Sequence, residues 1–380
     1  MHRLEISLKQ EARSSEINIG AGVRRDLGNL IPFKAPRRVG IVSNQRVFDL
    51  YGRDVVRSLK SAGFETFVWL MSEGERYKSF RMLEKAVNFL SENHFERDDL
   101  VMALGGGVVG DLAGFAAAIY LRGLRLTQVP TTLLSQIDSS VGGKTGINLP
   151  TGKNLVGAFH QPASVFIDTE TLATLPPREL TSGFCEMVKQ SLVAGESLFQ
   201  MTVDCLRNER ELNSPEFEDL IAAQCGFKAS IVANDEREST NRSDTKSRRV
   251  LNFGHTTAHA LETVTNYRHF RHGEAVGYGM LVAGELSRNL GLIDAGELKL
   301  LRDAVSLCGP LPRADNLDLN QITAALKHDK KSVGGQINWV LLEGIGRPRI
   351  VEGRLISAKS LRLSLRAGLK ALERQKESFH

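Results

Sequence analysis

The chain has 380 residues, of which 42% are hydrophobic and 24% charged, a composition typical of a globular protein long enough for two domains. The 49 Lys and Arg residues exceed the 44 Asp and Glu residues, and the resulting net charge of +5 suits an anionic small molecule better than nucleic acid. The longest apolar run, 112–121, is too short to cross a bilayer, and the N-terminus lacks the apolar core of a signal peptide. We therefore expect a cytoplasmic protein with no membrane or nucleic-acid partner.

The four cysteines, Cys185, Cys205, Cys225 and Cys308, are scattered along the chain. They form no CxxC pair of the kind that holds zinc, and no dense pattern that would indicate a disulfide framework. We therefore expect them to be reduced and buried.

Strand-like and helix-like segments alternate over the first part of the chain, to about residue 172. Such alternation predicts an α/β domain with a Rossmann-like parallel sheet that helices cover on both faces. The predicted elements are, in order, strands at 4–8 and 39–43, a helix at 47–62, a strand at 66–70, a helix at 80–90 and a strand at 100–104.

From about residue 179 the pattern changes to long helices, interrupted by a predicted β-hairpin between 337 and 351. Pro176 and Pro177 mark the expected boundary, so we predict an α/β domain at 1–175 and a mostly α-helical domain at 176–380. The polar run 236–247, ERESTNRSDTKS, predicts a loop.

The strand at 100–104 is followed by GGGVVGD at 105–111, which opens a predicted helix through Ala118. The glycines match GxGxxG, a motif that sets backbone N–H groups and a helix N-terminus against a pyrophosphate. The match is incomplete, because two strand–helix units precede it and no acidic residue follows at about 20 positions to bind the ribose. A tight turn without a ligand is the alternative, and the segment 73–78, EGERYK, could supply ribose contacts.

The glycine-rich segment 122–159 carries Arg122, Asp138, Lys144, Lys153 and Asn154, and its glycines let the backbone approach a ligand closely. GGKT at 142–145 resembles part of a phosphate loop, but Asp138 stands where GxxxxGK[ST] requires a glycine. We therefore do not expect a Walker-type ATPase. Taken singly, each lysine of this segment would be expected in solvent.

Histidines gather near residue 260. His255 and His259 stand four positions apart, so on a helix both imidazoles project from one face, with Glu262 along the same stripe. His272 lies beyond a predicted turn and can fold back. The residue after His255 is Thr256, so the glutamate base of the HExxH zinc proteases is absent. We interpret these histidines as a candidate metal or acid/base site, and ordinary surface or core histidines are the alternative.

A catalytic zinc usually takes three protein ligands, so two of these histidines need a carboxylate from elsewhere in the chain. Glu186 is the candidate, because its apolar neighbours predict burial, where a charged glutamate needs a metal or a cation. Lys189 follows one turn later, and a surface ion pair is the alternative. Lys228, Arg248 and Asn252 form a cationic, hydrogen-bonding set suited to a carboxylate.

Eight segments occur in an order that resembles the 3-dehydroquinate synthase family of sugar phosphate cyclases. They are GGGVVGDLAGF, YLRG, VPTTLLSQIDSSVGGKTGIN, GKNLVGAF, EMVK, LNFGHTTAHALE, HGEAV and DKK, and the match as a whole runs from about residue 40 to 335. The resemblance implies a homodimer in which NAD binds between an N-terminal α/β domain and a C-terminal helical domain that holds zinc, or cobalt, and the substrate.

The resemblance also implies roles for individual residues. The metal ligands would be Glu186, His255 and His272, which leaves His259 to meet the substrate. The positions that match NAD contacts are Glu73, Gly74, Glu75, Lys78, Gly107, Val108, Val109, Gly110, Asp111, Thr131, Thr132, Lys144, Lys153, Thr171, Leu172 and Thr174. The positions that match substrate contacts are Asp138 and Lys189 for hydroxyls, Lys228, Arg248 and Asn252 for the carboxylate, and Lys144, Asn154, His259 and Lys330 or Lys331 for the phosphate, with Arg122 from the partner subunit.

Three departures from the family pattern stand out. Glu73 replaces the usual aspartate, and Ala258 replaces the usual glycine before the second histidine. The loop between Glu238 and Arg248 is longer than usual, so the placement of Arg248 rests on its spacing to Asn252.

The implied activity is that of a lyase that converts 3-deoxy-D-arabino-heptulosonate 7-phosphate to 3-dehydroquinate and phosphate, in the shikimate route to chorismate and the aromatic amino acids. One alternative is another sugar phosphate cyclase whose substrate lacks a carboxylate, against which the presence of Lys228, Arg248, Asn252 and His259 argues. Others are a metal-dependent NAD alcohol dehydrogenase, which would release NADH, and a silent NAD-binding module.

Overall fold

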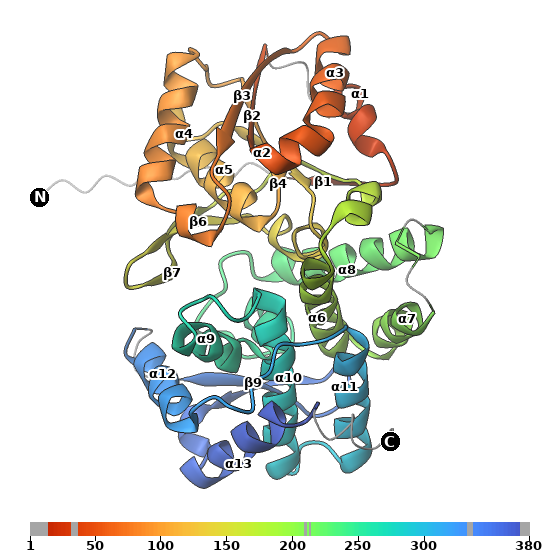
Figure 1. Cartoon of the computed structure of the whole chain (residues 1–380), viewed down its shortest axis with the longest axis vertical. Helices are drawn as coiled ribbons and strands as arrows, with labels where there is room; N and C mark the ends of the chain where they lie inside the picture. The colour runs from red at the N-terminus through yellow and green to blue at the C-terminus, as the bar shows by residue number, and fades with distance from the viewer. Residues whose placement is uncertain (1–13, 32–36, 209–210, 213, 333–336, 373–380) are drawn as a thin grey trace, which may run out of the picture.

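The computed structural model of the chain describes residues 14–31, 37–208, 211–212, 214–332 and 337–372. Figure 1 shows an α/β part at the top and a helical part below it, with the hairpin of β6 and β7 reaching from the first toward the second. This confirms the predicted fold class. The strand expected at 4–8 lies outside the described residues.

A single parallel sheet of six strands forms the α/β part, in the order β1-β8-β5-β4-β2-β3. The three predicted strands inside the described ranges are confirmed as β2, β3 and β4. The strands are β1 (Glu16–Ile19), β2 (Arg38–Asn44), β3 (Glu65–Met71), β4 (Leu100–Gly105), β5 (Arg125–Pro130) and β8 (Ser164–Ile167).

The central strand β4 shows why this sheet is covered on both faces. Every residue of β4 is buried, and successive side chains point to opposite faces of a strand. Leu100 and Met102 pack in one apolar cluster with helices α1 (Leu27–Leu30) and α3 (Arg53–Ser61). Val101 packs in another cluster, with α4 (Phe80–Glu92) and α5 (Gly107–Ile119), so the continuous apolar run of β4 serves two cores.

The predicted helices of this part are also present. The helix expected at 47–62 is formed by α2 (Gln45–Val47), a π-helical turn (Phe48–Gly52) and α3. The helix expected at 80–90 is α4, and the one expected to start in the GGGVVGD segment is α5.

Between β5 and β8 the chain forms an antiparallel hairpin, which the sequence did not reveal. Its strands are β6 (Lys144–Leu149) and β7 (Gly152–Phe159). Gly146 and Gly157 face each other across it, and a Cβ at Gly157 would lie 2.0 Å from the carbonyl oxygen of Thr145. The glycines here therefore permit close strand pairing.

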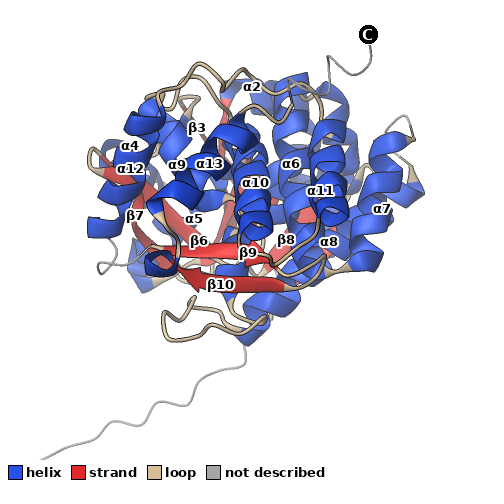
Figure 2. Ribbon diagram, turned by 90° about the horizontal axis from the view of Figure 1, so that it is seen from below, coloured by secondary structure: helices blue, strands red, loops and turns tan. Residues whose placement is uncertain are grey.

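The helical part is built around one nearly fully buried helix, α10 (His272–Asn289). Figure 2 shows α10 flanked by α6, α11 and α13, which also contact it. The hairpin expected at 337–351 is confirmed as β9 (Asn338–Leu342) and β10 (Pro348–Glu352). The other helices are α6 (Pro177–Ala194), α7 (Glu196–Arg207), α8 (Pro215–Asn234), α9 (His255–Val264), α11 (Ala295–Leu307), α12 (Leu319–Ser332) and α13 (Ala358–Leu369).

Helix α6 begins at Pro177, where the sequence predicted a boundary, but apolar packing continues across that point. Leu133, Ile137 and Leu172 belong to the same buried cluster as the helices that follow. The division at 175/176 therefore stays a prediction. The polar run 236–247 contains no helix or strand, as expected.

Two further expectations concern the whole chain. Cys185, Cys225 and Cys308 are buried and form no disulfide, as predicted, whereas Cys205 is only partly buried. Across the described residues, no helix combines the length and the apolar character needed to span a membrane.

Candidate active site

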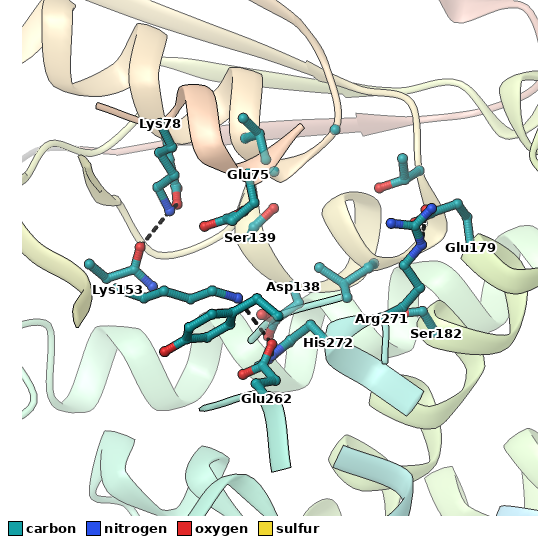
Figure 3. A pocket seen from close by; sticks show the side chains of 18 of the residues that line it. Glu75, Lys78, Asp138, Ser139, Lys153, Glu179, Ser182, Glu262, Arg271 and His272 are labelled. Carbon is teal, nitrogen blue, oxygen red and sulfur yellow. Dashed lines mark hydrogen bonds and ion pairs between the residues drawn. The ribbon is translucent and has the colours of Figure 1, made fainter. Parts of the chain in front are cut away.

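A cavity of about 1130 Å³ lies where the carboxyl ends of the parallel strands meet the helical part, and both parts line it. Open parallel sheets bind their ligands at this edge. Figure 3 shows side chains from both parts pointing into it. Of the predicted site residues, the lining includes Glu73, Gly74, Glu75, Lys78, Gly107, Val108, Val109, Asp111, Thr131, Thr132, Asp138, Lys144, Lys153, Asn154, Thr171, Thr174, Lys189, Lys228, Arg248, Asn252, His255, His259 and His272.

The predicted metal ligands come together from three helices at one wall of the cavity. Glu186 lies in α6, His255 begins α9 and His272 begins α10. Glu186 Oε1 lies 3.7 Å from His255 Nε2 and 3.4 Å from His272 Nε2. One ligand atom from each residue lies within 4.8 Å of the others, so a single divalent cation can contact all three.

The chemistry of this trio fits a cation. The side chain of Glu186 is 1% exposed, and within the described part of the chain nothing donates a hydrogen bond to its Oε1. A buried carboxylate oxygen without a donor is unfavourable unless a cation faces it. Lys189 Nζ lies 2.8 Å from the other oxygen, so the free position is on the side of the histidines.

Both histidines are oriented by bonds to their second ring nitrogen. His255 Nδ1 contacts the carbonyl oxygen of Phe253 at 3.3 Å, and His272 Nδ1 contacts Glu262 Oε1 at 3.4 Å. A proton on each Nδ1 satisfies these acceptors, and this tautomer leaves the Nε2 lone pair for a metal, as in known zinc sites. Burial and the nearby charge of Lys189 keep the pKa of His255 well below its ordinary value, which favours the neutral ligand form.

Close packing holds the start of α10 against α6. A Cβ at Gly273 would lie 1.9 Å from the carbonyl oxygen of Ser182, so only glycine fits between the two helices. The hydroxyl of Ser182 also accepts a hydrogen bond of 2.9 Å from the backbone N–H of Gly273. These contacts hold the start of α10 against α6 at Ser182, one turn before Glu186, so that the His272 side chain can reach Glu186.

His259 lies beside the trio. Its ring centroid is 5.6 Å from that of His255 and 6.1 Å from that of His272, and it lines the open cavity. The i,i+4 spacing suggested His255 and His259 as a ligand pair. In the structure His259 lies one helical turn after His255, outside the ligand trio, and faces the cavity.

A second cluster alternates buried cations and carboxylates. Lys228 Nζ lies 2.8 Å from Asp138 Oδ1, and Gln190 Nε2 donates to the same oxygen at 3.3 Å. Burial would raise the pKa of Asp138, but Lys228 and Lys189 outweigh it and hold that pKa well below its ordinary value. Burial lowers the pKa of Lys228, because desolvation exceeds the attraction of Asp138.

The polar loop brings Glu238 into this site. Glu238 Oε1 accepts a hydrogen bond of 2.7 Å from Asn252 Nδ2, and Oε2 pairs with Lys144. The Arg248 side chain is buried against Gly142, where a Cβ would lie 2.6 Å from its Nη2, and its Nη1 donates to the carbonyl of Glu236 at 2.7 Å. Arg248 thus reaches the cavity despite the longer loop.

At the sheet side, helix α5 begins directly after β4 with Gly106 as its N-cap and no side-chain cap. Its first backbone N–H groups and positive dipole end are therefore available to an anion such as a pyrophosphate. Lys78 pairs with Asp111 and Asn154 nearby. Across the sheet, the Tyr51 hydroxyl donates to the carbonyl of Thr171 at 3.0 Å and holds that segment at the cavity rim.

Some predicted residues lie elsewhere. Gly110 and Leu172 are buried and do not line the cavity, and a Cβ at Gly110 would lie 2.8 Å from Gln128 Oε1, so this glycine serves helix–strand packing. Arg122 is exposed at the end of α5 and is not part of the described cavity wall. The side chains of Lys330 and Lys331 lie outside the described residues.

The cavity also takes residues that sequence reasoning left out of the site. Asn44 is the last residue of β2, and the rule that ligands bind at the carboxyl ends of strands could have found it. Nothing in the sequence pattern marked the others, because their places depend on contacts between distant segments. They include Arg46, Tyr51, Ser139, Glu179, Tyr267 and Arg271.

Comparisons with known proteins agree with this geometry. A family model described as 3-dehydroquinate synthase N-terminal matches residues 68–182, and one described as 3-dehydroquinate synthase C-terminal matches 183–332. The 3-dehydroquinate synthase of Thermodesulfovibrio yellowstonii is 39% identical over 356 residues, covering 92% of this chain and 96% of that protein.

Two solved structures show the same fold. One is 2-epi-5-epi-valiolone synthase from Streptomyces hygroscopicus subsp. jinggangensis 5008 with NAD+ and Zn2+ bound, with a TM-score of 0.86 and 25% identity, covering 97% of this chain and 100% of that one. The other is 2-deoxy-scyllo-inosose synthase complexed with carbaglucose-6-phosphate, NAD+ and Co2+, with a TM-score of 0.79 and 26% identity, covering 93% and 96%.

Fold and site together define an enzyme of the sugar phosphate cyclase class, with places for a dinucleotide and a divalent cation. Within that class, the two matching models and the curated relative identify the particular branch. The chain belongs to the 3-dehydroquinate synthase family.

Proposed function

We propose that the protein catalyses the conversion of 3-deoxy-D-arabino-heptulosonate 7-phosphate to 3-dehydroquinate and phosphate, with NAD and zinc or cobalt. The observation that carries this proposal is the cavity itself, which His255 and His272 line, with Glu186 buried beside them, together with the start of α5 and a cluster of buried cations. The activity belongs to the shikimate route to aromatic amino acids and chorismate.

Each group has a proposed place. When bound, NAD accepts and returns a hydride, and the metal supplies a Lewis acid that acidifies a substrate hydroxyl. Glu186, His255 and His272 hold the metal. The residues that hold NAD are Glu73, Gly74, Glu75, Lys78, Gly107, Val108, Val109, Asp111, Thr131, Thr132, Lys144, Lys153, Thr171 and Thr174, all in the cavity lining, with Gly110 and Leu172 packing behind them.

The buried cations orient the substrate. Lys228, Arg248 and Asn252 bind its carboxylate, and Asp138 and Lys189 contact its hydroxyls near the metal. Lys144, Asn154 and His259 bind the phosphate, together with Lys330 or Lys331. Asp138 and Glu238 already pair with Lys228 and Lys144, so these cations are positioned before an anion arrives.

Positioning is the main contribution of these residues to the rate. A flexible seven-carbon chain held at both ends reacts in one conformation, and this saves much of the entropy of ordering it in solution. Desolvated lysine and arginine groups also stabilise negative charge that develops on the substrate. The ion pairs of Lys228 with Asp138 and of Lys189 with Glu186 compensate these two buried cations.

We further propose a homodimer in which Arg122 enters the partner's cavity. The support is that Arg122 is exposed and lies outside its own cavity wall, beside the exposed apolar side chains of Ile119 and Leu121. Mixing Arg122→Ala with Lys228→Ala protein tests this. In a two-fold dimer of the two variants, one site has both groups, so full exchange restores about a quarter of wild-type activity. Mixing without recovery would contradict the shared site.

The proposed division of labour is an NAD-binding domain at 1–175 and a metal- and substrate-binding domain at 176–380. It is supported by α6 beginning at Pro177 and by the metal trio lying wholly in the helices after it. We place the enzyme in the cytoplasm, and the four cysteines, all without a disulfide, fit a reducing compartment.

The decisive experiment is incubation with the heptulosonate phosphate and catalytic NAD. We expect phosphate release and a new carbocycle, with no accumulation of NADH. Steady NADH production would instead indicate an alcohol dehydrogenase. Because the valiolone synthase shares the fold closely, a sugar phosphate without a carboxylate should be tested in parallel. Faster turnover of that compound would indicate another cyclase of the class.

A further inference from the structure

The metal ligand His272 is connected to the α/β part through two side chains. Glu262 Oε1 lies 3.4 Å from His272 Nδ1, and the same oxygen lies 3.1 Å from Lys153 Nζ. The Glu262 side chain is 3% exposed, and its other oxygen is buried without a hydrogen-bond donor among the described residues. Figure 3 shows Lys153 extending across the cavity to Glu262 beside His272.

The side chain of Lys153 is held in position by two residues of the helical part, Glu262 and Tyr267. It stands near the start of β7, and its Nζ lies 4.4 Å from the centre of the Tyr267 ring, at a distance where a cation is attracted to an aromatic face. Tyr267 follows α9, so the helical part supplies both contacts of this lysine. The hairpin end is thereby held on the metal-binding helices.

The same hairpin is tied to the nucleotide side. The backbone N–H of Asn148 donates to the carbonyl of Lys78 at 2.8 Å, and Asn148 Nδ2 donates to Glu75 Oε1 at 2.7 Å. Asn148 Oδ1 accepts a hydrogen bond of 2.9 Å from the backbone N–H of Asn154, whose side chain binds Lys78. The hairpin therefore bridges the segment proposed to bind NAD and the residue that holds His272.

We propose that Glu262 is a positioning residue for the metal ligand His272, and that Lys153 on the hairpin makes metal affinity respond to dinucleotide binding. The inference rests on the proposed metal site. A carboxylate that accepts from the second nitrogen of a metal-binding histidine fixes the ring and raises its basicity. Lys153 compensates the buried Glu262 charge, so a hairpin held in place by a dinucleotide keeps the carboxylate on His272.

Such a coupling must work in both directions. If NAD fixes the hairpin and tightens the metal site, the metal must raise the affinity for NAD by the same factor. The structure supplies the two sites and the hairpin between them, whose two strands make separate polar contacts beside the turn, Asn148 with the nucleotide side and Lys153 with Glu262. Coupling through such an element is testable by comparing single and combined perturbations.

The test measures Co2+ and Zn2+ affinity of the full-length apoprotein, by Co2+ absorption and by competition with a metal indicator, with and without saturating NAD. We expect Glu262→Gln to weaken metal binding by roughly 10- to 100-fold. The matched control is Glu285→Gln, a buried carboxylate of α10 that pairs with Arg302, which should leave metal affinity unchanged. Glu262→Asp serves as a second variant should the glutamine form fail to fold.

For the coupling, we expect NAD to raise the metal affinity of the wild-type protein on the order of 5-fold or more. Lys153→Met should abolish this increase even at saturating NAD, and Lys153→Arg should retain most of it. Wild-type metal affinity in both Glu262 variants would overturn the positioning role, and an unchanged NAD effect in Lys153→Met would overturn the coupling. Metal binding at the wild-type level in Glu186→Gln would instead overturn the proposed metal site.

Discussion

The carboxylate of Asp235 accepts a hydrogen bond of 2.9 Å from the backbone N–H of Arg248, although a long polar loop separates the two residues. The other oxygen of Asp235 accepts from the backbone N–H of Ser239 at 2.9 Å. Burial would raise the pKa of Asp235, but these hydrogen bonds outweigh it and lower that pKa. One ionised side chain thus closes the loop 236–247 at both ends and returns Arg248 to the cavity.

Asp235→Asn should therefore weaken substrate binding without removing the metal. The amide cannot accept at both positions, and a lost hydrogen bond to a charged group costs about 1.5–3 kcal/mol, or roughly 10- to 100-fold in kcat/KM. The matched control is Asp244→Asn in the same loop, where Asp244 is exposed and pairs with Arg242. Equal kinetics for the two variants would show that the loop closure does not position Arg248.

The carboxylate pocket is tested by Arg248→Ala and Lys228→Ala. Removing one partner of a buried charged contact costs about 2–5 kcal/mol, so kcat/KM should fall roughly 30-fold or more, while NAD and zinc stay bound. Lys228→Ala should also lower stability, because it leaves Asp138 without its ion pair. Steady-state kinetics measures kcat/KM, metal analysis measures the bound zinc, and urea unfolding measures the stability of Lys228→Ala. Unchanged kinetics in either variant would refute the assignment of that residue.

The metal trio predicts different results for two neighbouring histidines. His272→Ala should remove metal and activity together, because its Nε2 is one of three ligand atoms. His259→Ala should keep the metal and lower activity, since this ring lies beside the trio and faces the cavity. Elemental analysis of both purified variants distinguishes the two roles. A metal-free His259→Ala protein would contradict the role given to His259, and a His272→Ala protein with its full metal content would contradict the role of His272 as a ligand.

Strands β2, β3 and β4 of the six-stranded sheet and the long helices were predictable because their apolar patterns are strong. Every residue of β4 is buried, and such a continuous run is hard to mistake. The hairpin of β6 and β7 was not predicted, because β7 is mostly half-buried or exposed and its pairing depends on the close approach of Gly146 and Gly157. A strand without a buried face leaves little periodicity to detect.

The site was only partly predictable. Spacing alone brought His255 and His259 together and placed Glu262 on their stripe, but it could not show that His272 returns to Glu186. The family motifs supplied that pairing. The contact of Lys153 with Glu262 joins residues 109 positions apart, and no local pattern encodes it.

The buried pair of Asp138 and Lys228 gives a prediction about pH. The folded-state pKa of Asp138 is lowered, so its ionised form contributes stability in full above the ordinary aspartate pKa of about 3.9 and loses it as pH falls through the folded value. The difference in unfolding free energy between wild type and Asp138→Asn should therefore stay constant from about pH 8 to 5 and close only at more acidic pH. Urea unfolding of the metal-free proteins measures it. Asp98→Asn, at a carboxylate that is 94% exposed, is the control and should show no difference at any pH. A difference that stays the same at more acidic pH as well would mean that Asp138 titrates near its ordinary value and that the surrounding lysines do not hold it ionised.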